Sequence, residues 1–171
     1  MFGTILGGNL SDLILEKERV QQIYLSCLEH AGVKGFVEVV VSPNVVDGLS
    51  CMIQSAGLGA LRPNTILMGW PRDWTDNRNL MAYHIFLDTM RNIALARNAL
   101  IVLKADTFPS KGMRLTGTID IWWIVNDGGM LLLLGHLLRR HKTWSKCKLR
   151  LFSVAGEEDN TVQIKKDLET Y

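Results

Sequence analysis

Apolar residues in this chain form short buried runs that alternate with stretches of three- to four-residue period, which predicts strands alternating with helices. Strands are expected at residues 2–6, 37–41, 65–69, 99–104, 119–125 and 149–154. Helices are expected at about 9–30, 43–56, 80–97 and 129–142, and from residue 160 onward. This order predicts an α/β fold with a mostly parallel sheet and helices on both faces.

Residues at the expected boundaries support this interpretation. Gly32 suits the end of the first helix, and the hydroxyl of Ser42 with Pro43 suits the start of the second. The third helix is expected to pack through Tyr83, Leu87, Met90 and Ala94. The connection 105–117 has no helical period, whereas a parallel return usually needs a helix-length crossover. A mixed sheet with one antiparallel strand therefore stays an alternative.

Length and composition are those of one folded domain covering residues 1–171. The chain has 171 residues, of which 47% are hydrophobic, and a net charge of +2, which argues against nucleic-acid binding. Three cysteines without CxxC spacing favour a reducing compartment. The first residues lack a basic leader, and no apolar run reaches the ~20 residues of a membrane helix, so a soluble chain is expected.

The most informative segment is the turn after the strand at 119–125. Asp127 ends that strand, and Gly128 with Gly129 opens the next helix. Such turns lie at the carboxyl end of a parallel sheet, where unpaired backbone amides can meet ligands or partners. Asp127 can be a helix N-cap or part of such a contact, and the pattern leaves both open.

The tryptophans divide into two groups. Trp122 and Trp123 are adjacent on one strand, so they face opposite sides; helices are expected to cover both, with a partner chain as the alternative for one. Trp70 follows a strand and could stack on an adenine or a protein side chain. Trp74 and Trp144 are in polar segments and are candidates for an interface.

A basic run begins at the end of the fourth expected helix. It can be read as cations that favour a helix C-terminus, followed by a solvated loop, or as a patch for anionic lipid headgroups or an acidic partner. Its members are Arg139, Arg140, His141, Lys142, Lys146, Lys148 and Arg150.

The residues give no catalytic constellation. The four histidines have neither HxxxH nor HxH spacing, and the GxSxG, GxxxxGK[ST] and GxGxxG motifs are lacking. Asp120 and Asp127 are too far apart along a strand for shared acid-base work. The chain is therefore not expected to be an enzyme and needs no cofactor.

Two long segments of the chain have a distinctive sequence, VKGFVEVVVSPNVVDGLSCMIQSAGLGALRPNTILMGWPRDW and GTIDIWWIVNDGGMLLLLGHLLRRHKTWSKCKLRLFSVAGEEDNTVQIKKDLETY. They resemble the C-terminal cytosolic domain of the cation-chloride cotransporters, in the potassium-chloride branch. The resemblance covers nearly the whole chain. It implies a fold like that of universal stress proteins, a place on the cytoplasmic side of the plasma membrane, and a role in regulating chloride and potassium transport.

The resemblance also implies partners and a ligand. The partners are the protein's own transmembrane domain and a second copy of the chain, while the ion-transport residues belong to membrane helices outside this chain. ATP or ADP would bind at Thr4, Ile5, Gly69, Trp70 and Pro71. The family's first strand and helix are missing here, and Ile14 stands where a tyrosine is expected. The alternative is a stand-alone nucleotide-binding α/β protein, either a stress-protein-like sensor or a nucleotide-using enzyme.

Overall fold

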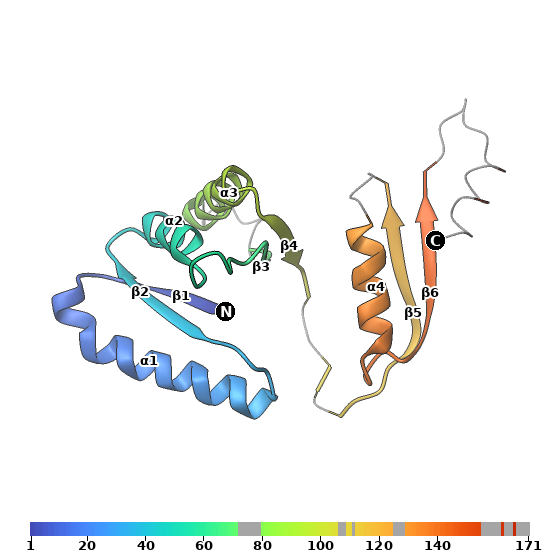
Figure 1. The fold of residues 1–171 in the computed structure, drawn as a ribbon, viewed down its shortest axis with the longest axis horizontal. Coiled ribbons are helices and arrows are strands. Elements are labelled where there is room, and N and C mark those ends of the chain that lie inside the picture. Colours follow the sequence, from blue (N-terminus) through green and yellow to red (C-terminus); the bar gives the residue numbers. More distant parts are fainter. Residues whose placement is uncertain are drawn as a thin grey trace. The chain divides into compact units, whose positions relative to one another are not determined.

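A computed structural model describes residues 1–71, 80–105, 109–110, 112–124, 129–154, 162 and 166. Among the described elements, strands and helices alternate, except that the fourth strand is followed by the fifth without a helix between them (Figure 1). Their order is β1 (Phe2–Gly7), α1 (Leu10–Ala31), β2 (Val37–Ser42), α2 (Val45–Ser55), β3 (Thr65–Gly69), α3 (Leu80–Leu95), β4 (Ala99–Leu103), β5 (Thr116–Trp123), α4 (Met130–Arg140) and β6 (Lys146–Ser153).

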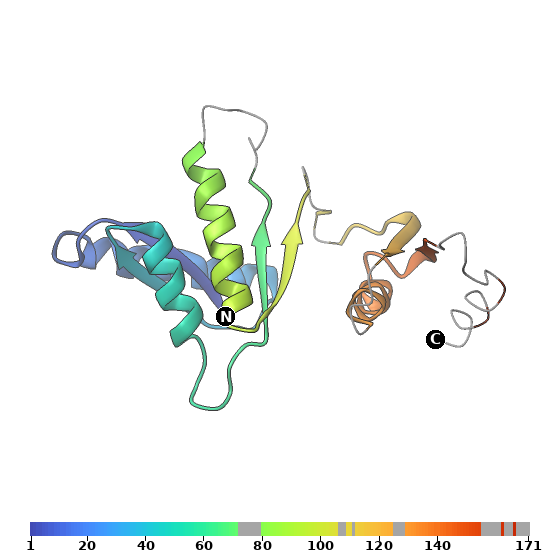
Figure 2. The same ribbon diagram turned by 90° about the horizontal axis from the view of Figure 1, so that it is seen from above.

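The strands pair two by two, and every pair is parallel. β1 pairs with β2, β3 with β4 and β5 with β6, and each pair is joined through one helix. In Figure 2, β3 and β4 run side by side in the same direction. The only antiparallel contact among the described residues is the isolated bridge between Leu58 and Leu61. The α/β class with parallel pairing is therefore confirmed.

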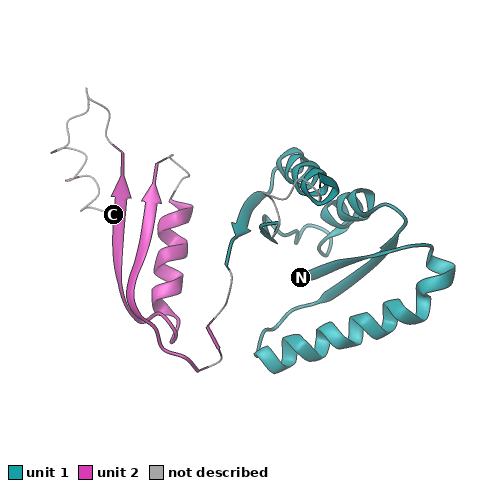
Figure 3. Ribbon diagram, turned by 180° about the vertical axis from the view of Figure 1, so that it is seen from behind, with its two compact units in different colours: residues 1–106 teal, residues 107–171 magenta. Residues whose placement is uncertain are grey.

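The chain divides into two compact units, Met1–Asp106 and Thr107–Tyr171, which Figure 3 colours separately. Unit 1 contains β1 to β4 with α1 to α3, and unit 2 contains β5, α4 and β6. The assignment of residues 1–171 to a single domain stays a prediction.

In unit 1, helices cover both faces of the β1–β2 pair, with α1 on one side and α2 on the other (Figure 1). The ring of Phe2 lies 4.6 Å from that of Tyr24 on α1. On the opposite face, a side chain at Gly3 would collide with Met52 of α2. Val37 and Val39 of β2 are buried in consequence, and Val39 is only 1% exposed. Such burial explains the nearly continuous apolar run in β2.

The ends of the first two helices follow different capping rules. Gly32 ends α1 in the left-handed conformation expected for it, with a φ of 72°. The prediction that Ser42 caps α2 was wrong, because the Asn44 carboxamide accepts from the Val46 amide at 2.9 Å. Ser42 instead donates its hydroxyl hydrogen to the Asn44 carbonyl at 2.7 Å, and Pro43 precedes the helix.

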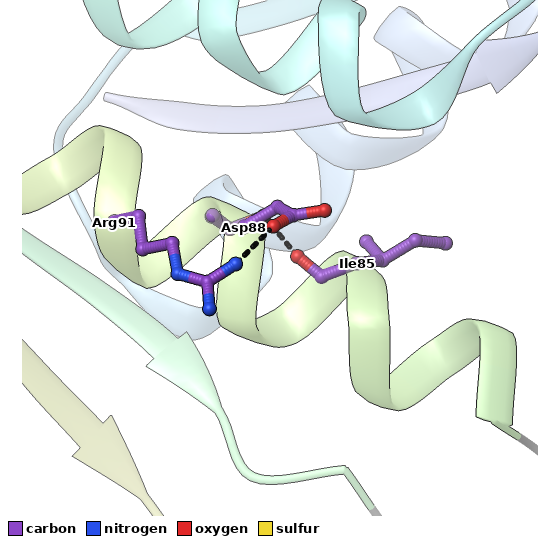
Figure 4. A network of polar contacts seen from close by, with 4 residues as sticks. Ile85, Asp88 and Arg91 are labelled. Atoms are coloured by element: carbon purple, nitrogen blue, oxygen red, sulfur yellow. Dashed lines mark hydrogen bonds and ion pairs between the residues drawn. The ribbon is translucent and has the colours of Figure 1, made fainter.

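Helix α3 packs through a different stripe from the one predicted. Phe86, Thr89 and Ile93 are buried. Of the predicted stripe, Leu87 and Met90 are half-buried, and Tyr83 and Ala94 are exposed. Because α3 has apolar residues on several sides, periodicity did not separate two neighbouring stripes. Arg91 donates to the Asp88 carboxylate at 2.9 Å (Figure 4). The Thr89 hydroxyl donates to the Ile85 carbonyl of the same helix at 2.6 Å.

In unit 2, both strands begin three residues earlier than predicted. β5 starts at Thr116, and β6 starts at Lys146 because the segment KCKLRLF alternates polar and apolar side chains. The basic residues Lys146 and Lys148 therefore belong to a strand rather than to a loop. The expected helix from residue 160 lies outside the described residues, apart from positions 162 and 166.

The expectation that helices cover both Trp122 and Trp123 was wrong for Trp122. Trp123 is half-buried, on the face that α4 covers. Trp122 is 60% exposed on the other face, where its ring stacks on Phe152 at 4.5 Å. An adjacent aromatic pair guarantees opposite faces, but it does not say that both faces are covered.

Candidate functional site

Trp70 is the best-defined aromatic surface at the end of a strand. Its backbone amide donates to the Leu103 carbonyl at 2.8 Å, which fixes it beside the end of β4. Its ring meets Phe86 of α3 edge-on, with 5.5 Å between centroids. The Lys104 ammonium lies 5.8 Å from the Trp70 centroid, within cation–π range. The ring is 37% exposed and combines a stacking surface with a neighbouring positive charge.

The other residues predicted for nucleotide binding lie on two different sheets. Thr4 and Ile5 are half-buried in β1, where Ile5 packs against Gly48 of α2. Gly69 ends β3, and Pro71 follows Trp70. A side chain at Gly69 would meet nothing within 4 Å, so a ligand could approach the backbone there. β1 and β3 are not hydrogen-bonded neighbours, and nucleotide binding by this set stays a prediction.

The turn before α4 is described only in part. Gly129 is the N-cap of α4, with a φ of 85° that L residues with side chains rarely adopt. Asp127 and Gly128 lie outside the described residues; the N-cap position belongs to Gly129, and a contact of Asp127 with a ligand or partner stays a prediction.

The predicted basic run is divided between a helix end, a turn and a strand. Arg139 and Arg140 are exposed in the last turn of α4, where cations favour the helix dipole. Lys142 is exposed in the following turn, and Trp144 is half-buried there with its ring 5.4 Å from that of His141. Lys146, Lys148 and Arg150 continue along β6 at alternate positions and therefore share one face.

One member of the run has an acidic partner across the sheet. Arg150 donates from Nε to Asp120 Oδ1 at 2.8 Å and from Nη2 to Oδ2 at 2.5 Å. This bidentate hydrogen bonding lowers the pKa of Asp120, and a hydrogen bond from Thr118 lowers it further. The same interaction raises the pKa of Arg150. Asp120 is thus a structural partner of β6.

Among the described residues, no group of three or more His, Cys, Asp or Glu side chains could hold a metal ion. None of the described helices has both the length and the apolar character needed to cross a bilayer.

A family model matches the chain in two overlapping parts. Residues 1–107 and 89–170 match the model of solute carrier family 12, so the match includes both compact units. The chain belongs to solute carrier family 12. This family comprises the cation-chloride cotransporters, which are membrane transporters and not a family of enzymes.

Sequence reasoning missed two contacts, that of Lys104 with Trp70 and that of Arg150 with Asp120. Lys104 lies beside Trp70 because β3 and β4 are parallel and pair Gly69 with Leu103, so the residues that follow them are neighbours. Asp120 and Arg150 are directly opposite in the register of β5 and β6. Both follow once the strands are paired in parallel with Thr65 opposite Ala99 and Ile119 opposite Leu149.

Proposed function

We propose that this chain is the regulatory and dimerisation domain of an electroneutral potassium-chloride symporter, on the cytoplasmic side of the plasma membrane. The observation that supports this most is the family match, which extends over both units. The potassium-chloride branch is supported by the resemblance of the segments 33–74 and 117–171 to that branch. Ion binding would belong to membrane helices, and this domain would control their activity.

The experiment for this proposal is a chimera. The chain would replace the corresponding segment of a potassium-chloride cotransporter, and chloride-dependent rubidium uptake would be measured with and without sodium. Uptake that needs chloride but not sodium is expected. Ile121→Asp should abolish it, because Ile121 is only 6% exposed, whereas Ile124→Asp, at a position 64% exposed, should not. A chimera that reaches the cell surface but needs sodium would contradict the proposed branch.

Dimerisation is the second part of the proposal. The chain leaves several large apolar side chains exposed, including Leu67 of β3 at 63% and Leu133 of α4 at 57%. Exposed apolar surface favours association. We expect a dimer or larger species at micromolar concentration in sedimentation equilibrium. A single species of 19.2 kDa over a wide concentration range would refute this part.

ATP or ADP would be a regulatory ligand, with the Trp70 ring and the Lys104 ammonium as its nearest aromatic and cationic groups. Because Thr4 and Ile5 lie on a different sheet from Gly69, we expect affinity no tighter than the millimolar range, about −4 kcal/mol. Isothermal calorimetry with ATP measures this. ATP turnover by the purified chain, lost in Asp127→Ala without unfolding, would instead support a nucleotide-using enzyme.

A further inference from the structure

One face of the β5–β6 sheet is lined by polar, basic and aromatic side chains and lies away from α4. Gly135 of α4 fits against Ile121 and Leu149, which shows that these two residues define the covered face. On each strand, the residues at the positions directly before and after these two therefore point to the other side. In the register of the sheet, the pairs on this open face are Thr116 with Lys146, Thr118 with Lys148, Asp120 with Arg150, and Trp122 with Phe152.

The charge on this open face is positive. Asp120 is the only acidic residue at the described positions between 109 and 154, and Arg150 already binds its carboxylate. Lys146 and Lys148 are exposed, and threonines stand opposite them. Within the described part of unit 2, this face therefore offers no second carboxylate to these lysines.

The carboxyl end of the open face is aromatic. Trp122 stacks on Phe152 with 15° between the ring planes, and the Arg150 guanidinium lies 5.4 Å from the Phe152 centroid. Trp122 remains 60% exposed despite this stack. The face thus combines exposed cations with an exposed indole, a side chain with an apolar body and a polar tip that favours membrane interfaces.

Charge complementarity decides between occupants of this face. A second copy packed face to face would bring two positively charged faces together, which is unfavourable. A wholly apolar helix would bury Lys146 and Lys148 without partners. An anionic lipid surface offers negative charge to the lysines and an interfacial environment to Trp122.

We propose that the open face of the β5–β6 sheet docks on an anionic membrane surface, with Lys146 and Lys148 at the headgroups and Trp122 in the interface. This inference goes beyond the proposed regulatory function, and it needs only that the domain lies close to a bilayer. It assigns the contact with the membrane to the strand residues of the basic run and not to Arg139 and Arg140 at the end of α4.

The test is cosedimentation of the full chain with phosphatidylcholine vesicles, with and without phosphatidylserine. Binding is expected only with phosphatidylserine, and Lys146→Gln with Lys148→Gln should weaken it by about 30-fold. The matched control, Arg139→Gln with Arg140→Gln, removes the same charge from the same unit and should weaken binding less than about threefold. Equal losses from the two pairs, or equal binding to both vesicles, would overturn the proposal.

Two further measurements separate this proposal from its rivals. Brominated lipids should quench tryptophan fluorescence in the wild type and quench it less in Trp122→Phe, whose circular dichroism should be unchanged. Soluble polyglutamate serves as the probe for an acidic protein partner. If it binds and requires both lysines while vesicles do not bind, an acidic protein is the occupant and the membrane proposal is wrong.

Discussion

The β1–β2 and β5–β6 pairs are built by the same rule but are covered differently. Each is a parallel pair whose two strands are joined through one helix. In β1–β2 a second helix, α2, lies on the other face, and Val39 is almost completely buried. In β5–β6, α4 covers one face and Trp122 is exposed on the other. The β-α-β connection therefore secures one covered face, and the second depends on another element.

The sequences of β2 and β6 reflect this difference in coverage. β2 reads VEVVVS and is mostly apolar, as expected for a strand between two layers. β6 reads KCKLRLFS and alternates, as expected for a strand with one covered face. Parallel sheets usually have both faces covered, so an alternating parallel strand points to a surface that meets water, a membrane or a partner.

The largest expected effect tests the covered face of β5–β6. Ile121→Ala should lower the free energy of unfolding by about 2–5 kcal/mol, because Ile121 is 6% exposed and packs against Gly135. Hydrogen exchange in peptides from β5, α4 and β6 measures the loss. Ile124→Ala is the control at an exposed position and should change stability by less than about 1 kcal/mol. Similar losses in both variants would show that the covered face is assigned wrongly.

The second prediction concerns the close approach of α4 to the sheet. A side-chain carbon at Gly135 would lie 2.5 Å from Ile121 Cδ1, so Gly135→Val should overpack this contact and cost about 1–3 kcal/mol. Gly69→Val is the matched control, since nothing lies within 4 Å of the corresponding carbon. Denaturant midpoints of the two variants compare them. A stable Gly135→Val variant would mean that α4 can move away from β5 at little cost.

Much of the fold could be predicted from the sequence, and the exceptions have physical causes. The bounds of β3 were predicted correctly because its apolar run is preceded by Pro63-Asn64 and ends in Gly69. The start of β6 was missed because lysines at alternate positions suggested a solvated loop. The candidate nucleotide-binding residues were placed by resemblance and the turn and basic-run residues by local pattern. Contacts such as that of Lys104 with Trp70 depend on register, which local pattern does not give.

The third prediction concerns the open face. Trp122→Ala should cost about 0.5–1.5 kcal/mol, because the indole is 60% exposed and loses mainly its stack on Phe152. A buried tryptophan would cost about 3–5 kcal/mol. Urea denaturation of this variant and of Ile121→Ala compares the stability that the exposed face and the covered face of β5 contribute. A loss as large as that of Ile121→Ala would mean that another element covers Trp122 in solution.

The smallest expected effect is the acid response of the ion pair between Asp120 and Arg150. Their hydrogen bonds lower the pKa of Asp120 in the folded state, so the native state binds this proton less readily than the unfolded state does. The stabilising contribution is therefore present above the unfolded pKa of about 4 and is lost as the pH falls through the folded value. Asp120→Asn should destabilise unit 2 slightly at neutral pH, and the difference from wild type should shrink below about pH 4. Urea midpoints measured from neutral to acidic pH test this, with Asp88→Asn as the control for an ion pair within one helix. A difference that stays constant across that range would show that the carboxylate charge of Asp120 does not contribute to stability.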